Sequence, residues 1–311
     1  SVTGKPFDLL WKATGRTGNL KGITNTDMKS GFAGDLSLVD NDGDGTVDLV
    51  YGADVGGRIW RFDINKDNTS ANNFATGGML ADFNNDTVDG NIRFYTQPDI
   101  SYTEYGKIEI EDANNPGTYI LQTLGRYQIV IGSGFRAGPL SKAVNDKVFV
   151  INDYDTEKAP VAAGYKTLEI SDLADYQSFA TTTPAKRTNG FYYDLPDDGE
   201  KVLSTTMTVN DVIYVPTFRP SDANREIGCE PDTGQARLIV LKPASDPYTT
   251  ERIERTIDLK QGGIVPKPVL IFPPTDPDNP GPVKPIIAIG TETTPPEGDF
   301  DAFQKTYWRQ N

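Results

Sequence analysis

The sequence contains no histidine and a single cysteine, Cys229. The absence of histidine excludes Ser-His-Asp and Cys-His catalytic arrangements and the usual zinc ligand sets. One cysteine cannot form an intrachain disulfide or a multi-cysteine metal site, so we expect Cys229 to be a lone loop thiol. We therefore expect a chain that is not an enzyme, without hydrolytic or redox activity of its own.

Long apolar runs are also missing, since no stretch approaches the ~20 residues that a membrane-spanning helix needs. The chain starts at Ser1 without a basic-then-apolar leader, which predicts an intracellular or already trimmed protein. Positive charge is scarce: 30 Lys and Arg stand against 44 Asp and Glu, for a net charge of −14. Nucleic-acid binding requires a concentrated cationic surface, so no nucleic-acid partner is expected.

Glycine and proline, by contrast, are abundant at 30 and 22 residues, and they separate short β-branched runs. Apolar residues make up 37% of the 311 positions, which is ample for a packed core. This composition predicts an extended, turn-rich, all-β protein.

Four similar strand candidates recur along the chain, centred on Leu49, Ile129, Ile213 and Ile287, at spacings of 80, 84 and 74 residues. Each follows another candidate, at 34–39, 98–102, 204–209 and 266–272. Each precedes a third, at 58–64, 147–151, 237–241 and 304–309, and further strands are expected at 190–195 and 253–259. Antiparallel units recurring in this way predict a β-propeller-like fold, modified or partial, with about four to five blades in residues 1–311.

The four predicted units cover residues 34–64, 97–151, 203–241 and 264–309. Their spacing exceeds the ~40–50 residues of compact blades, so long loops are expected at 67–89, 104–118 and 273–283. Residues 5–15 are predicted to be the outer strand of a preceding blade, within a terminal segment 1–15. A β-sandwich, in which the units need not repeat, is the alternative fold.

The segment from Asp40 to Asp48 reads DNDGDGTVD and places carboxylates at loop positions 1, 3, 5 and 9. Their mutual repulsion falls when a hard cation collects their oxygens, and a flexible all-oxygen loop suits Ca²⁺. Gly45 at position 6 permits a turn that lets the Thr46 carbonyl join the shell. The predicted calcium ligands are Asp40, Asp42, Asp44, Thr46 and Asp48.

The loop departs from a complete EF-hand, because Tyr51 occupies position 12 in place of the bidentate glutamate. The alternative is a solvated acidic turn whose residues serve turn geometry alone. A second acidic stretch, residues 82–89, has Asp82, Asn84 and Asp86 at the equivalents of loop positions 1, 3 and 5. Its last aspartate, Asp89, is at position 8, one residue before the position 9 of the first loop. It is expected to be a polar loop, and a second ion site is its alternative.

The segment 34–64, GDLSLVDNDGDGTVDLVYGADVGGRIWRFDI, resembles the calcium-loop blade of PilY/PilC-type proteins, the type IV pilus tip adhesins. Further similar segments follow in the same order: Gln97-Pro98, IVIGSGFRAGPL at 129–140, GFYYDLPDDGEKVLSTTMTVNDVIYVPTF at 190–218, GGIVPKPVLI at 262–271 and TYWR at 306–309. The resemblance therefore covers nearly the whole chain.

This resemblance implies a C-terminal, modified β-propeller, with its calcium-loop blade at about residues 31–66. It implies a protein exported through the periplasm to the pilus tip at the cell surface, where it meets minor pilins and host-cell or abiotic surfaces. There it would support pilus extension against retraction, with the calcium loop modulating twitching motility, adhesion and virulence.

Two alternative functions stay open. The first is a quinone-dependent dehydrogenase, because DLLWKATG at 8–15 and GGRIWRFD at 56–63 are similar to blades of those enzymes. The second is a surface propeller that binds carbohydrate.

Overall fold

The computed structural model describes most of the chain. The described residues are 9–18, 21–68, 70, 73–85, 87–88, 90–103, 107–112, 114–123, 125–154, 156, 160, 165–177, 189–221, 233–242, 252–273 and 284–297. Within these ranges the regular structure is strand, apart from one short 3₁₀ turn, η1, at Ile170–Asp172. The predicted all-β class is confirmed. No helix in these ranges has the length and apolarity to cross a membrane.

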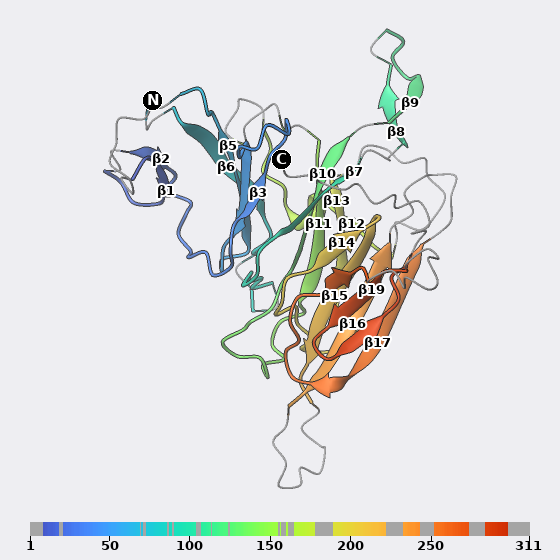
Figure 1. Cartoon of the computed structure of the whole chain (residues 1–311). Helices are drawn as coiled ribbons and strands as arrows, with labels where there is room; N and C mark the ends of the chain where they lie inside the picture. Colours follow the sequence, from blue (N-terminus) through green and yellow to red (C-terminus); the bar gives the residue numbers. More distant parts are fainter. Residues whose placement is uncertain are drawn as a thin grey trace.

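Four larger sheets follow one another along the chain (Figure 1). The first sheet has the order β3-β4-β5-β6, with strands at Ser37–Val39, Leu49–Ala53, Arg58–Ile64 and Ala75–Asp82. The second has the order β12-β13-β11-β10-β7, with strands at Ala174–Asp175, Gly190–Asp194, Lys147–Asp153, Arg126–Gly132 and Asp99–Thr103. All pairs in these two sheets are antiparallel except β12 with β13.

The third and fourth sheets are purely antiparallel. The third has the order β14-β15-β16-β17, with strands at Met207–Val209, Val212–Arg219, Gln235–Lys242 and Ile253–Gly262. The fourth has the order β18-β19-β20, with strands at Val269–Ile271, Ile286–Ile289 and Glu292–Thr294. Each predicted unit thus forms its own sheet, which excludes strands interleaved in a two-sheet sandwich and agrees with the predicted propeller-like arrangement.

Three apolar clusters hold consecutive sheets together. The first joins the first and second sheets, the next the second and third, and the last the third and fourth. Ile213 on β15 packs toward the second sheet, whereas its neighbour Tyr214 packs toward the fourth. Successive strand residues point to opposite faces, so a strand buried on both faces is apolar throughout. This is why β10, β11, β15 and β16 each contain a continuous apolar run.

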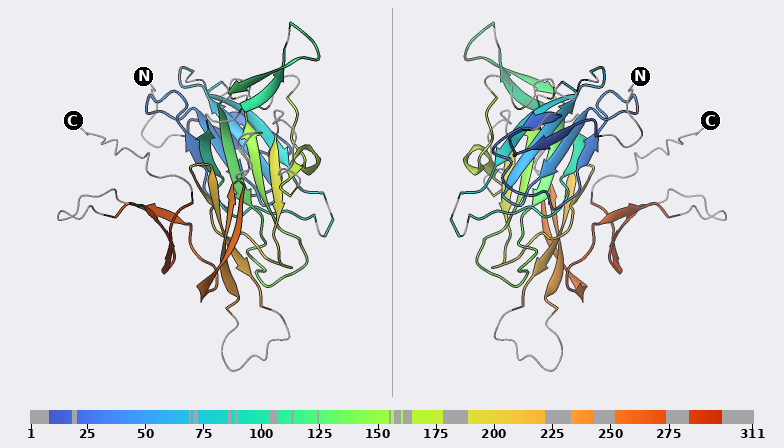
Figure 2. Two further views of the ribbon diagram at one scale, coloured as in Figure 1. Left: turned by 90° about the vertical axis from the view of Figure 1, so that its right-hand side faces the viewer. Right: turned by 90° about the vertical axis from the view of Figure 1, so that its left-hand side faces the viewer.

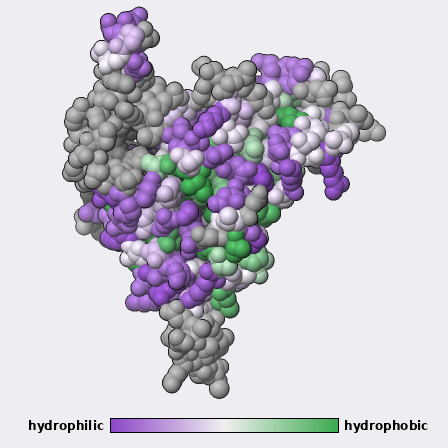
Figure 3. Space-filling view, turned by 180° about the vertical axis from the view of Figure 1, so that it is seen from behind, coloured by the Kyte–Doolittle hydropathy of each residue, from purple (hydrophilic) through white to green (hydrophobic). Residues whose placement is uncertain are grey.

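The end sheets leave some apolar side chains uncovered. Leu38 on β3 is 62% exposed, and Val269 on β18 is 53% exposed. Figure 3 shows apolar side chains gathered near the middle of one face of the molecule, with polar ones around them.

A buried polar cluster joins the first two sheets inside the apolar interface. The Arg61 guanidinium, with a fully buried side chain, donates to Asp63 (2.8 Å) on its own strand and to Asp153 (2.7 Å) on β11. The Tyr51 hydroxyl donates to the same Asp153 carboxylate at 3.0 Å. A buried guanidinium needs such carboxylate partners, because burying a charge without a partner is costly.

Several elements differ from the prediction. β6 lies inside the stretch 67–89, which its composition predicted to be a loop. A Cβ at Gly77 would lie 2.3 Å from the Arg61 carbonyl, so the glycine allows β6 to lie against β5. The predicted loop 104–118 contains β8 at Lys107–Glu111, which pairs with β9 at Tyr119–Thr123 in a hairpin that projects from the body (Figure 2).

The terminal segments also differ. β1 at Lys12–Thr14 pairs in parallel with β2 at Gly22–Thr24 in a two-stranded sheet, so this part of the predicted outer strand 5–15 does not join a larger sheet. Trp11 beside it packs edge-on against Phe62 of β5 at 5.5 Å. In the fourth sheet the third strand is β20. The strand predicted at 304–309, most of the loop predicted at 273–283, and Cys229 lie outside the described residues.

Candidate metal site

The acidic loop of residues 40–48 connects β3 to β4. Val39 and Leu49 face each other in the antiparallel ladder, so the two ends of the loop are held side by side. The Asp48 amide donates to the Val39 carbonyl at 2.9 Å, and the Asp48 carbonyl accepts from the Ile64 amide of β5 at 2.7 Å. The sheet therefore fixes Asp40 and Asp48, the first and last predicted ligands, next to each other.

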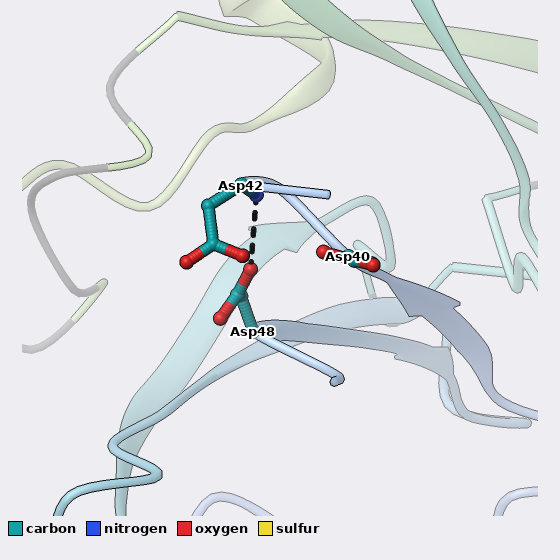
Figure 4. Close-up of side chains that lie close together, drawn as sticks. All are labelled: Asp40, Asp42 and Asp48. Atoms are coloured by element: carbon teal, nitrogen blue, oxygen red, sulfur yellow. Dashed lines mark hydrogen bonds between the residues drawn. The ribbon is translucent and has the colours of Figure 1, made fainter. Parts of the chain in front are cut away.

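Three of the predicted ligands converge. One carboxylate oxygen from each of Asp40, Asp42 and Asp48 lies within 4.8 Å of the other two (Figure 4). They come from the start, the middle and the end of the loop, and Asp40 and Asp42 are exposed. Carboxylate oxygens gathered at one point are the donor set that a hard cation such as Ca²⁺ prefers.

Backbone amides inside the loop hold these carboxylates in place. Asp40 accepts from the amides of Gly43 and Gly45, each at 2.7 Å. Asp48 accepts from the amides of Asn41 at 2.7 Å and Asp42 at 3.3 Å, and the latter bond is drawn in Figure 4. Gly45 has φ of 86°, as predicted for the turn at position 6. Because each carboxylate oxygen has two lone pairs, these bonds leave acceptor capacity for an ion.

The remaining two predicted ligands, Asp44 and Thr46, contact each other. The Asp44 carboxylate accepts from the Thr46 amide at 2.9 Å and from its hydroxyl at 2.6 Å. Asp44 is not part of the three-carboxylate cluster. It lies beside that cluster and would have to turn toward it to bind the same ion.

A lysine from outside the loop contacts three of its carboxylates. Lys66 follows β5, and its ammonium pairs with Asp42 at 2.9 Å, with Asp44, and with Asp48 at 4.0 Å. The Lys66 hydrogen bond is the main reason that the pKa of Asp44 lies well below its usual range, and bonding to Asp44 raises the pKa of Lys66. One ammonium against four carboxylates leaves the loop strongly negative, so the loop still fits a divalent cation.

A tyrosine from the second sheet also contacts the loop. The Tyr127 hydroxyl on β10 donates to the Asn41 side chain at 2.8 Å. Burial is the main cause that raises the pKa of Tyr127, with the nearby Tyr102, Asp48 and Asp40 acting in the same direction. The acidic loop is therefore part of the contact between the first two sheets.

The sequence motif identified neither Lys66 nor Tyr127. A signal for Lys66 did exist, because pairing Leu49 with Asp63 in the β4-β5 hairpin places the residues after β5 beside the loop. The Tyr127 contact depends on how two sheets pack, and no sequence pattern marked it. In the second acidic stretch, Asp82 pairs with Arg58 at 3.0 Å, whereas Asp86 lies outside the described residues.

No protein-family model matches this sequence. In an alignment of 226 positions that covers 68% of the chain, it is 26% identical to a protein described as "Type IV pilus biogenesis factor PilY1 homolog" from Xylella fastidiosa. A solved structure, the C-terminal domain of Pseudomonas aeruginosa PilY1, matches the fold over 83% of this chain and 59% of that one, with a TM-score of 0.51 and 14% identity. The chain is similar to PilY1 in sequence and in fold.

The PilY1 likeness confirms the resemblance predicted from the sequence motifs and supports the β-propeller-like fold. At 14% identity, the comparison with the solved PilY1 domain shows the fold alone. The chain spans 14% of the length of the PilY1 homolog that it matches. The function of the whole homolog can therefore be assigned to this chain only as a proposal.

Proposed function

We propose that the chain is the propeller-like domain of a type IV pilus biogenesis protein that lies outside the cell at the pilus tip. In this role it supports pilus extension against retraction, and thereby twitching motility, and it contacts minor pilins and a host-cell or abiotic surface. The observation that carries the proposal is the match over 68% of the chain to a pilus biogenesis factor. The PilY1-like fold supports it independently.

We propose further that the acidic loop holds Ca²⁺ through Asp40, Asp42 and Asp48, with Asp44 and Thr46 completing the shell. The bound ion would supply positive charge that offsets carboxylate repulsion. Backbone amides of the loop orient the carboxylates, and Asn41 links the loop to Tyr127 on the second sheet. Calcium would thus stiffen an inter-sheet contact in a module that carries out no catalysis.

Calorimetry on the purified chain tests the metal site. Wild type should bind Ca²⁺ with a dissociation constant of about 10⁻⁷–10⁻⁵ M or weaker, since the bidentate glutamate is missing. Calcium at 100 times that constant should add about 2.7 kcal/mol to the free energy of unfolding. Asp48→Ala should abolish binding and keep the fold, whereas the exposed Asp198→Ala serves as a charge-matched control. Equal Ca²⁺ binding by wild type and Asp48→Ala would contradict the metal-site proposal and show that the loop is only an acidic turn.

The pilus role is tested in the native cell. Deleting the region that encodes this chain should reduce surface pili and twitching, and loss of the retraction motor should restore pili if the domain opposes retraction. Pilus number and motility unchanged by the deletion would contradict the biogenesis proposal, whatever the calorimetry shows.

A further inference from the structure

Segments from all four sheets meet at an open bay of about 310 Å³. Its lining includes Asp35 before β3, Gln97 before β7, Thr205 before β14 and Lys267 before β18. The bay therefore lies where the first strand of every larger sheet begins. Ligand pockets occupy such convergences, and their volumes run from about 300 to 1,000 Å³.

The walls of the bay are joined by hydrogen bonds between neighbouring sheets or the segments that lead into them. They run from Gln97 Nε2 to the Leu36 carbonyl (3.0 Å), from Arg136 Nη1 to the Leu203 carbonyl (3.2 Å), and from Ser204 Oγ to the Val265 carbonyl. Each bond ties one sheet to the next, so the bay is a fixed feature of the sheet series. A preformed site loses less conformational entropy when a ligand binds.

The charge of the bay is opposite to that of the chain. Two exposed cations, Arg136 and Lys267, and a single carboxylate, Asp35, line it, in a protein of net charge −14. The guanidinium fork of Arg136 suits a carboxylate, which it can bind through two parallel hydrogen bonds. The bay therefore favours an anionic group.

The rest of the lining suits a polyhydroxylated ligand. Thr96, Ser204 and Thr205 bring hydroxyl groups, Gln97 brings an amide, and the half-buried Tyr95 brings an aromatic ring. Such groups both donate to and accept from sugar hydroxyls. We propose that the bay binds an acidic sugar residue of a glycan, with its carboxylate on Arg136 and Lys267 and its hydroxyls on Asp35 and the hydroxyl side chains.

This site is separate from the acidic loop. Asp35 precedes β3 and the loop follows it, so the two sites lie at opposite ends of the same short strand. Sugar binding therefore goes beyond the proposed pilus and calcium functions, and it should be the same with calcium or with a chelator. A negative result for sugar binding at the bay would therefore not contradict calcium binding at the acidic loop, and the reverse also holds.

Titration calorimetry on the purified chain tests the proposal with N-acetylneuraminic acid, D-glucuronic acid and neutral D-glucose as probes. One of the acids should bind at least about tenfold more tightly than glucose, as expected for a charge-assisted hydrogen bond. Equal binding of acid and neutral sugars would overturn the proposal. Tighter binding of an N-acetylated dipeptide with a free carboxylate would also overturn it, because the site would then recognise a peptide terminus.

Two variants locate the site. Lys267→Gln and Arg136→Gln should each weaken acid-sugar binding about tenfold. Lys260→Gln, which changes an exposed lysine on β17, should leave it unchanged. Because Arg136 also bonds the Leu203 carbonyl, thermal melts accompany that variant, and Lys267→Gln decides the matter if Arg136→Gln unfolds. Unchanged binding by Lys267→Gln would place the sugar elsewhere and overturn the proposal.

Discussion

The Tyr127 hydroxyl and the Asn41 side chain form a 2.8 Å hydrogen bond across 86 positions of the sequence. Asn41 lies between two predicted calcium ligands, and Tyr127 lies on the first long strand of the second sheet. The hydrogen bond therefore links the acidic loop of the first sheet to the second sheet. Asp153, opposite Tyr127 in the ladder, belongs to the buried polar cluster of the same interface.

Tyr127→Phe should weaken this contact. Loss of one hydrogen bond should lower the free energy of unfolding by about 0.5–1.5 kcal/mol and reduce calcium affinity a few-fold, because Asn41 no longer anchors the loop. Urea unfolding and calorimetry measure the two effects. Tyr102→Phe is the matched control, since its ring lies 5.2 Å from that of Tyr127 and its side chain is exposed. Identical behaviour of the two variants would show that the hydroxyl contact carries no energy.

Lys66→Met should increase calcium affinity by about three- to tenfold. The variant removes an ammonium that competes with the ion for the Asp42 and Asp44 carboxylates, so more negative charge is left for the ion. Calorimetry at low salt measures the change, because salt screens these charges. Lys29→Met, at an exposed lysine outside the loop, is the control. An unchanged or lower affinity would mean that Lys66 supports the loop and does not compete with the ion.

Asp153→Ala should destabilise the protein by about 3–5 kcal/mol. It leaves the buried Arg61 guanidinium without its partner across the sheet interface, and removing one member of a buried ion pair has this typical cost. The double variant Arg61→Met with Asp153→Ala should recover part of the loss, because the fully buried guanidinium is removed and the carboxylate left without it, Asp63, is partly exposed to solvent. Chemical denaturation of the single and double variants measures both. A cost below about 1 kcal/mol for Asp153→Ala would contradict the structural role of the pair.

Asp146 should make stability depend on pH. Burial raises its pKa to about 6, against the opposing charges of Lys201, Arg93 and Lys147, and its Oδ1 accepts from Ser133 at 2.7 Å. Its folded pKa exceeds its unfolded pKa of about 4, so the folded state binds the extra proton between these values. The stability that this proton provides is complete below pH ~4 and is lost as pH rises through ~6.

Asp146→Asn tests this dependence, since an amide resembles the protonated acid. Relative to wild type, the variant should be more stable at pH 7.5 than at pH 4.5 by about 1–3 kcal/mol. Urea unfolding at both pH values measures the difference, and the comparison with wild type removes the contribution of the other carboxylates. Parallel pH profiles of variant and wild type would show that Asp146 does not titrate in this range.

Much of the fold was predictable because strand signals are local. The strand predicted at 58–64 has the same bounds as β5, and 147–151 falls within β11, since both are rich in β-branched and aromatic residues and end at a polar turn. β6 was missed because it contains glycines that only its position against β5 explains. The hairpin β8–β9 was missed because β8 lies within residues 104–118, a stretch whose Gly, Pro, Asn and Asp residues are typical of loops.

The candidate site divides in the same way. Its predicted ligands fall within nine consecutive residues, so the alternation of the motif predicts them without knowledge of the fold, and the structure brings three of their carboxylates together. Lys66 lies beside the loop because of the register of the β4-β5 hairpin. Tyr127 contacts the loop because the second sheet packs against the first. The sequence therefore predicts the chemistry of the loop, whereas the groups that tune it depend on tertiary structure.

Each larger sheet is built from one contiguous stretch of the chain, and this has a consequence for folding during synthesis. The third sheet, for example, uses only strands between residues 207 and 262. A chain that emerges from its N-terminus can complete the ladder of one sheet before the next sheet exists. Because the second and third sheets are apolar on both faces, each newly emerged sheet covers the face left open by the one before it. If the sheets fold in the order of their synthesis, each new sheet buries an apolar face of the sheet before it and leaves one apolar face open.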